Sequence, residues 1–241
     1  MRFSACLLAL AVLCAAQSVS AQSDQRPNRH EILESQADAL IFGTPLRWFG
    51  VVSGFVFFGG CDFELFPDER CFDLQPDPAV TSWVASDIAS ITFPGNTFKT
   101  VICPVLVHTH NFALANNTAS PQFDARFSVR TSITLESQVL LDPSAIDAGT
   151  GAPLNGKVEF PFGSRTVSRS LNPGERQSDS LQYSRDCQAG INRANLIGFG
   201  VPEALVDKLL REPMTLHLNM SGNVRMLQFG GLSVAMRVMG N

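Results

Sequence analysis

The chain has 241 residues, of which 45% are hydrophobic and only 17% are charged. This composition supplies enough apolar side chains for a buried core and excludes a disordered chain, a collagen or a coiled coil. The formal net charge is −4. Because the chain has no basic surplus to neutralise phosphates, nucleic acid is not an expected partner.

The first 21 residues have the features of a secretory signal peptide. Arg2 supplies a positive charge, residues 5–16 are apolar, and Val19-Ser20-Ala21 places small side chains before a cleavage site. The alternative is a lipid anchor on Cys14, which is disfavoured because Leu13 stands where a small residue is preferred. No later apolar run reaches the roughly 18 residues of a transmembrane helix. We expect a secreted or extracellular protein, periplasmic if its source is a Gram-negative bacterium.

Residues 22–42 are expected to form an N-terminal segment, and residues 43–241 a single domain. Two stretches have helical spacing. Residues 30–40 place apolar side chains on one side of a short helix, and residues 202–211 open on a proline and stop before Pro213.

Most of the domain has a period of two, which is typical of half-buried antiparallel strands. Apolar and polar residues alternate over residues 126–136, 158–162, 216–220 and 232–238. Residues 99–114 begin apolar on both faces, as a central strand does. Turn signals occur at residues 94–96, 116–117, 142–143, 172–174 and 221–223. The pattern predicts a mostly β fold, an antiparallel β-sandwich of jelly-roll type with one or two short helices.

Four cysteines follow the predicted signal peptide, and an even number in an exported chain predicts two disulfide bonds. Three pairings are open for Cys61, Cys71, Cys103 and Cys187. Pairing Cys61 with Cys71 is favoured because their separation is short, which leaves Cys103 with Cys187.

Residues 61–78 are strongly acidic. Clustered carboxylates beside a closed loop are suited to calcium, which binds six to eight oxygens. The candidate calcium ligands are Asp62, Glu64, Asp68 and Glu69. Their spacing matches no EF-hand or repeat-type calcium motif, and the alternative is a solvated acidic loop. Unless this segment binds calcium, we expect no cofactor.

Three histidines form a second candidate metal site. His108 and His110 lie two apart on a predicted strand and point to one face, and His217 lies on another predicted strand. Leu106, Phe112 and Leu114 share that face, so the favoured alternative is a pair of histidines in the core or at its rim.

No local motif indicates an enzyme. The nearest string to a hydrolase nucleophile turn, residues 231–235, lacks its second glycine. A pair of carboxylates that cleaves glycosidic bonds meets only in the fold, so a secreted hydrolase acting on carbohydrate stays an alternative without named residues.

Short motifs also resemble a known family. They are Gly43-Thr44-Pro45, Val51-Val52-Ser53-Gly54, Phe57-Phe58-Gly59-Gly60, the stretch ITFPGNTF at 91–98 and the stretch VLVHTHNFAL at 105–114. Over residues 43–238 this order resembles the "choice-of-anchor" type of extracellular β-sandwich domain. The resemblance implies an exported sandwich and no catalytic residues. The Cys61–Cys71 segment departs from the family's pattern.

These observations together predict a secreted, disulfide-stabilised β-sandwich that acts as a binding or structural module for an extracellular ligand, either a glycan or a protein. The alternatives are the carbohydrate hydrolase and a calcium-stabilised adhesion domain. Two sequons, at Asn116 and Asn219, are relevant only in a eukaryotic host.

Overall fold

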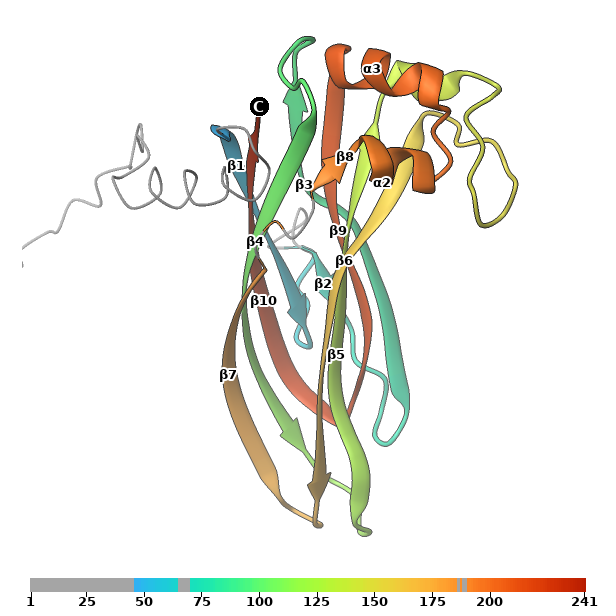
Figure 1. The fold of residues 1–241 in the computed structure, drawn as a ribbon. Coiled ribbons are helices and arrows are strands. Elements are labelled where there is room, and N and C mark those ends of the chain that lie inside the picture. The colour runs from blue at the N-terminus through green and yellow to red at the C-terminus, as the bar shows by residue number, and fades with distance from the viewer. Residues whose placement is uncertain (1–45, 65–69, 186, 188–189) are drawn as a thin grey trace, which may run out of the picture.

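The structure is a computed structural model that describes residues 46–64, 70–185, 187 and 190–241. Two β-sheets pack face to face over most of the molecule, and two short helices lie together at one end (Figure 1). The prediction of a mostly β sandwich with few helices is confirmed.

The larger sheet has six strands in the order β2-β1-β10-β4-β7, with β8 paired to β4. Its pairings are antiparallel except for the parallel pair β1–β2. The bounds are β1 (Arg47–Phe58), β2 (Cys71–Phe72), β4 (Val101–Ala115), β7 (Arg176–Arg185), β8 (Ile191–Asn192) and β10 (Leu227–Gly240).

The smaller sheet has four antiparallel strands in the order β3-β9-β5-β6. Their bounds are β3 (Val80–Phe93), β5 (Gln122–Glu136), β6 (Lys157–Leu171) and β9 (Met214–Arg225). The five predicted strand stretches lie in β4, β5, β6, β9 and β10.

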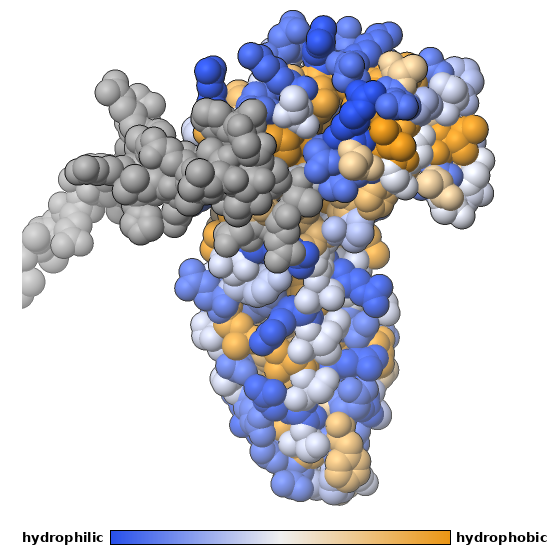
Figure 2. All heavy atoms as spheres, in the orientation of Figure 1, coloured by the Kyte–Doolittle hydropathy of each residue, from blue (hydrophilic) through white to orange (hydrophobic). Residues whose placement is uncertain are grey.

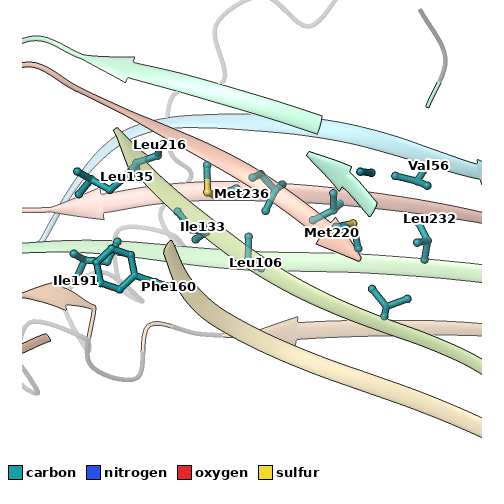
Figure 3. Close-up of a cluster of buried hydrophobic side chains, with 14 of the residues drawn as sticks. Val56, Leu106, Ile133, Leu135, Phe160, Ile191, Leu216, Met220, Leu232 and Met236 are labelled. Carbon is teal, nitrogen blue, oxygen red and sulfur yellow. The ribbon is translucent and has the colours of Figure 1, made fainter. Parts of the chain in front are cut away.

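The core lies between the two sheets because alternate side chains of each strand point inward. Leu106, Ile133, Leu216 and Met236 come from four different strands and are almost fully buried (Figure 3). The other faces of both sheets point outward and are available for function.

The predicted helix at 202–211 is confirmed as α3 (Glu203–Arg211), which buries Val206, Leu209 and Leu210. The sequence analysis did not predict α2 (Arg193–Gly198) or the 3₁₀ helix η1 (Gln138–Leu141). Both are less than two turns long, which is too short for a 3.6-residue period to emerge.

One predicted turn is wrong. Residues 221–223 lie inside β9, and the chain crosses to the other sheet at Met226, whose φ is +59°. Gly222 resembles a turn residue but is required for packing, because a Cβ there would overlap the carbonyl group of Ser128 on β5.

Both disulfides form in the favoured pairing, Cys61 with Cys71 and Cys103 with Cys187. The first closes a short segment beside β1 and β2. The second ties the buried β4 to the segment that follows β7.

The predicted signal peptide (1–21), the segment 22–42 and the helix at 30–40 lie outside the described residues. None of the helices in the part that the structure describes is long and apolar enough to cross a membrane.

The two disulfides should contribute unequally to stability. The bonds close loops with sequence separations of 10 and 84 residues. In the chain-entropy model, loops of these sizes correspond to about 2–3 and about 4–5 kcal/mol of stabilisation. The Cys103→Ser/Cys187→Ser pair should therefore lower the free energy of unfolding more than Cys61→Ser/Cys71→Ser does, as measured by urea denaturation. The reverse order would contradict this interpretation.

Candidate functional site: a polar groove on the four-stranded sheet

The outer face of the four-stranded sheet is hollowed by a groove of about 330 Å³. His217 on β9, Thr134 on β5 and Glu159 on β6 lie side by side on the floor of the groove, since the ladders pair Thr134 with both of the others. The pairing of three strands therefore determines the positions of the residues that form the floor of the groove.

A bulge in β3, the fourth strand of this sheet, borders the groove next to β9. Between the pairs Ala85–Met220 and Ala89–Leu218, three residues of β3 lie opposite one residue of β9. The middle one, Asp87, has a φ of +52°, the left-handed region that is costly for a residue with a side chain. Bulges of this kind redirect a side chain, and here the bulge directs Asp87 toward β9.

Asn219 holds this conformation in place. Its Oδ1 accepts a 2.8 Å hydrogen bond from the backbone N–H of Asp87, and its Nδ2 donates to Thr134 Oγ1 at 2.9 Å. One side chain thus connects the bulge to the floor of the groove.

On the side that faces the core, the backbone of the bulge packs against β1. A Cβ at Gly54 would lie 2.7 Å from the carbonyl oxygen of Ile88, the residue after Asp87. Only glycine lets the two strands approach so closely, so the position of Asp87 depends on Gly54.

His217 lies between two carboxylates. Its Nδ1 is 2.9 Å from Asp87 Oδ1, and its Nε2 is 3.0 Å from Glu136 Oε2. The Nδ1 contact with Asp87 is a hydrogen bond, whereas Nε2 lies close to the Glu136 carboxylate without forming one.

Glu136 and Glu159 have further partners on their own side of the groove. Lys157 Nζ lies 3.0 Å from Glu136 Oε2, and its hydrogen bond is the main reason that the pKa of Glu136 lies below its usual value. Ser132 donates a hydrogen bond to Glu159. The carboxylates of Asp87 and Glu159 and the ammonium group of Lys157 line the groove, and Glu136 lies beside it in contact with Lys157 and His217.

The carboxylates near His217 differ from those of a glycosidase in two respects. A glycosidase needs a carboxylic acid with a raised pKa, whereas the pKa of Glu136 is lowered. The two carboxylates on His217 lie at opposite nitrogens of its ring and so do not converge on one point. Among the described residues, no group of three or more His, Cys, Asp or Glu side chains could hold a metal ion.

The groove was not predicted from the sequence. Asp87, Glu136 and Glu159 are far apart in the chain, and a three-residue bulge leaves no periodic signal. His217 was singled out, but for a different site. One sequence feature could have indicated the bulge: an aspartate, Asp87, interrupts the alternation of apolar and polar residues between Trp83 and Ile91.

The predicted three-histidine site is wrong. His108 and His110 point into the core, where 3% and 2% of their surfaces are exposed, whereas His217 lies on the outer face of the other sheet. The alternative of core histidines is correct. The two rings lie 5.7 Å apart between Tyr183 and Phe127.

The calcium candidates are only partly described. Asp68 and Glu69 lie outside the described residues. Asp62 accepts a hydrogen bond from the backbone N–H of Glu64 at 3.2 Å. The calcium site stays a prediction.

Both sequon asparagines use their amide groups inside the fold. Asn116 is fully buried and donates to the carbonyl groups of Ser120 and Leu171. Asn219 holds the bulge. Neither amide nitrogen projects freely from the folded domain.

No family model and no curated protein matches the chain, so the choice-of-anchor resemblance stays a prediction. Solved structures of infectious bursal disease virus match at TM-scores of 0.22: the Gx strain and the T13 viral particle, each 9% identical over 81% of this chain. The chain spans about a third of those chains, 32% and 31%. Likeness at this level carries no argument about function.

The buried histidines should make the protein sensitive to acid. Burial is the largest cause that lowers the pKa of each to about 4, with a further contribution from the other histidine at His108 and from Arg165 at His110. Because the folded pKa lies below the unfolded value of about 6.5, the unfolded chain binds more protons between pH 6.5 and 4. Stability should fall through this window as pH decreases, by on the order of 2–3 kcal/mol for each histidine.

Urea denaturation at several pH values checks this prediction. His108→Leu/His110→Leu should flatten the dependence between pH 6.5 and 4. An unchanged slope in the double variant would contradict the assignment.

Gly54→Ala should displace the bulge. The added methyl group would press on the Ile88 carbonyl, and such overpacking costs about 1–3 kcal/mol. Gly231 on the outer face of β10 is the matched control, because a Cβ there meets no atom closer than 3.7 Å. Equal thermal stability of Gly54→Ala and Gly231→Ala would contradict the role of Gly54.

Proposed function

We propose that the protein is an exported β-sandwich module that binds a polar extracellular ligand in the groove beside Asp87. The observation that carries this proposal is the left-handed backbone of Asp87, held by Asn219. Strained residues cluster at functional sites because the surrounding structure maintains them at a cost in stability. The strain here places a carboxylate on the rim of a groove.

Two further observations support an extracellular role. Both disulfides are formed, and disulfide bonds persist chiefly in oxidising compartments outside the cytosol. The first 21 residues have the pattern of a signal peptide.

The composition of the groove limits its ligand. Asp87 and Glu159 are acceptors, whereas Lys157 and the amide of Asn219 are donors. A ligand that carries hydroxyl and amino groups would satisfy both kinds of partner. A strongly anionic ligand would be repelled.

Saturation binding to cells of the source organism tests the proposal. The purified, oxidised protein is labelled with a fluorophore, and binding is compared for wild type, Asp87→Asn and Glu159→Gln. A hydrogen bond that involves a charged group contributes about 1.5–3 kcal/mol, so each variant should bind about tenfold or more weakly. Asparagine tolerates the left-handed conformation, so Asp87→Asn should leave the fold unchanged.

Asp207→Asn on α3 is the matched control, because it removes a carboxylate at the helical end of the molecule. It should bind as wild type does. Absence of saturable binding by the wild type, or equal binding by Asp87→Asn and Asp207→Asn, would refute the proposal.

A further inference from the structure

We propose that His217 is an acid-sensitive switch for the groove, which leaves Asp87 available to a ligand at neutral pH and withdraws it when the imidazole takes up a proton. This inference rests on the proposed function, because it concerns the ligand that the groove binds. It follows from three features: the contacts of the two ring nitrogens, the burial of one of them, and a carboxylate oxygen that His217 shares with Lys157.

The two ring nitrogens of His217 have different roles in the neutral ring. Nδ1 makes a hydrogen bond of 2.9 Å with Asp87 Oδ1. Because a carboxylate only accepts, Nδ1 carries the proton and Nε2 carries a lone pair. Nε2 lies 3.0 Å from Glu136 Oε2 and is buried without a hydrogen-bond partner among the described residues. In the neutral ring, two lone pairs therefore face each other across this contact.

A proton taken up from solvent at Nε2 reverses the sign of that contact. The imidazolium ion has an N–H group at each nitrogen. A carboxylate oxygen already lies within 3.0 Å of each one, so both N–H groups have an acceptor at hand. Hydrogen bonds between charged groups are roughly twice as strong as those between neutral groups. The protonated ring therefore holds Asp87 more firmly than the neutral ring does.

Glu136 connects His217 to the cation of the groove. Its Oε2 atom lies 3.0 Å from Lys157 Nζ and 3.0 Å from His217 Nε2, so one oxygen serves both side chains. A charged imidazole competes with Lys157 for this oxygen, and both of these side chains line the groove. Protonation thus adds a positive charge to the groove and engages Asp87. Both changes oppose a ligand that offers amino or hydroxyl hydrogens to Asp87.

The charged groups around the imidazole come from every strand packed beside it. They are Asp87 on β3, Glu136 on β5, Lys157 and Glu159 on β6, and Arg70, whose guanidinium group lies 3.5 Å from the main-chain oxygen of Asp87. The direct contacts of the ring are with carboxylates, whereas the two cations contact Glu136 and the backbone of Asp87. The carboxylates are therefore the groups that respond first to a proton on the ring.

Of the three described histidines, His217 is the one that lines the groove. Imidazole is the side chain that changes charge between about pH 5 and 8. His108 and His110 lie between the sheets, and burial lowers the pKa of each to about 4. A change in ligand binding at higher pH is therefore attributed to His217 rather than to the buried pair.

Saturation binding of the labelled protein to cells of the source organism tests the switch when it is repeated at about pH 8 and about pH 5.5. Wild type should bind about three- to tenfold more weakly in acid, the size expected for one new charge close to a surface site. The ratio of the two affinities should be close to one for His217→Gln, which cannot take up the proton. Titration of the cell surface would affect both proteins alike. Circular dichroism at the acidic pH verifies that both are folded.

Asp207→Asn on α3 is the matched control, because it removes a carboxylate far from the groove; it should lose affinity in acid as wild type does. A second measurement needs no ligand. The backbone amide of Asp87, which Asn219 holds, should shift with pH in proton–nitrogen NMR spectra of wild type and stay constant in His217→Gln.

The outcomes separate the switch from the function on which it rests. A loss of affinity in acid that persists in His217→Gln, equal affinities of wild type at both pH values, or an Asp87 amide that shifts alike in both proteins would overturn the switch and leave the proposed function standing. Absence of saturable binding by wild type at either pH would refute the proposed function and the switch with it.

Discussion

The close approach of β1 and β3 is the constraint on which the groove depends. Gly54 has no side chain, so the backbone of Ile88 can rest directly against β1. The β3 chain therefore bulges at this point, and the bulge directs Asp87 outward while Ile88 packs against the core. A single inward-facing glycine on one sheet thus determines which carboxylate appears on the outer face of the other.

The two outer faces of the sandwich differ in chemistry although the same strand pattern builds both. On the four-stranded sheet, carboxylates, an ammonium group and an imidazole surround a groove. On the six-stranded sheet, exposed phenylalanine rings lie on β1 and β10, and the guanidinium group of Arg176 lies over the ring of Phe229. In the view of Figure 2 polar residues predominate over the strand-covered part of the molecule, and apolar residues gather nearer the helical end.

The sequence predicts which residues form the core far better than it predicts the features on the outer faces of the two sheets. Alternation in β5, β6, β9 and β10 identifies the buried side of each strand, because burial imposes a period of two. Chain separation was sufficient to favour the observed disulfide pairing.

The groove could not be predicted from the sequence because its residues come from four strands that meet only after folding. The bulge at Asp87 breaks the alternation of β3, and Gly222 resembled a turn residue although it serves packing inside β9. Phenylalanine has no polar atom and is most often a core residue. Phe55, Phe57 and Phe229 are exceptions that only the strand register reveals.

The central claim is that the conformation of Asp87 costs stability and is retained for the groove. The most direct measurement is the free energy of unfolding of Asp87→Gly in urea. Glycine adopts a φ of +52° without strain, whereas the lost hydrogen bond between Asp87 and His217 lies at the surface and contributes little. The account predicts that the variant is as stable as wild type or more stable by up to about 1 kcal/mol. A loss of more than about 1 kcal/mol would show that Asp87 is a structural residue and would contradict the account.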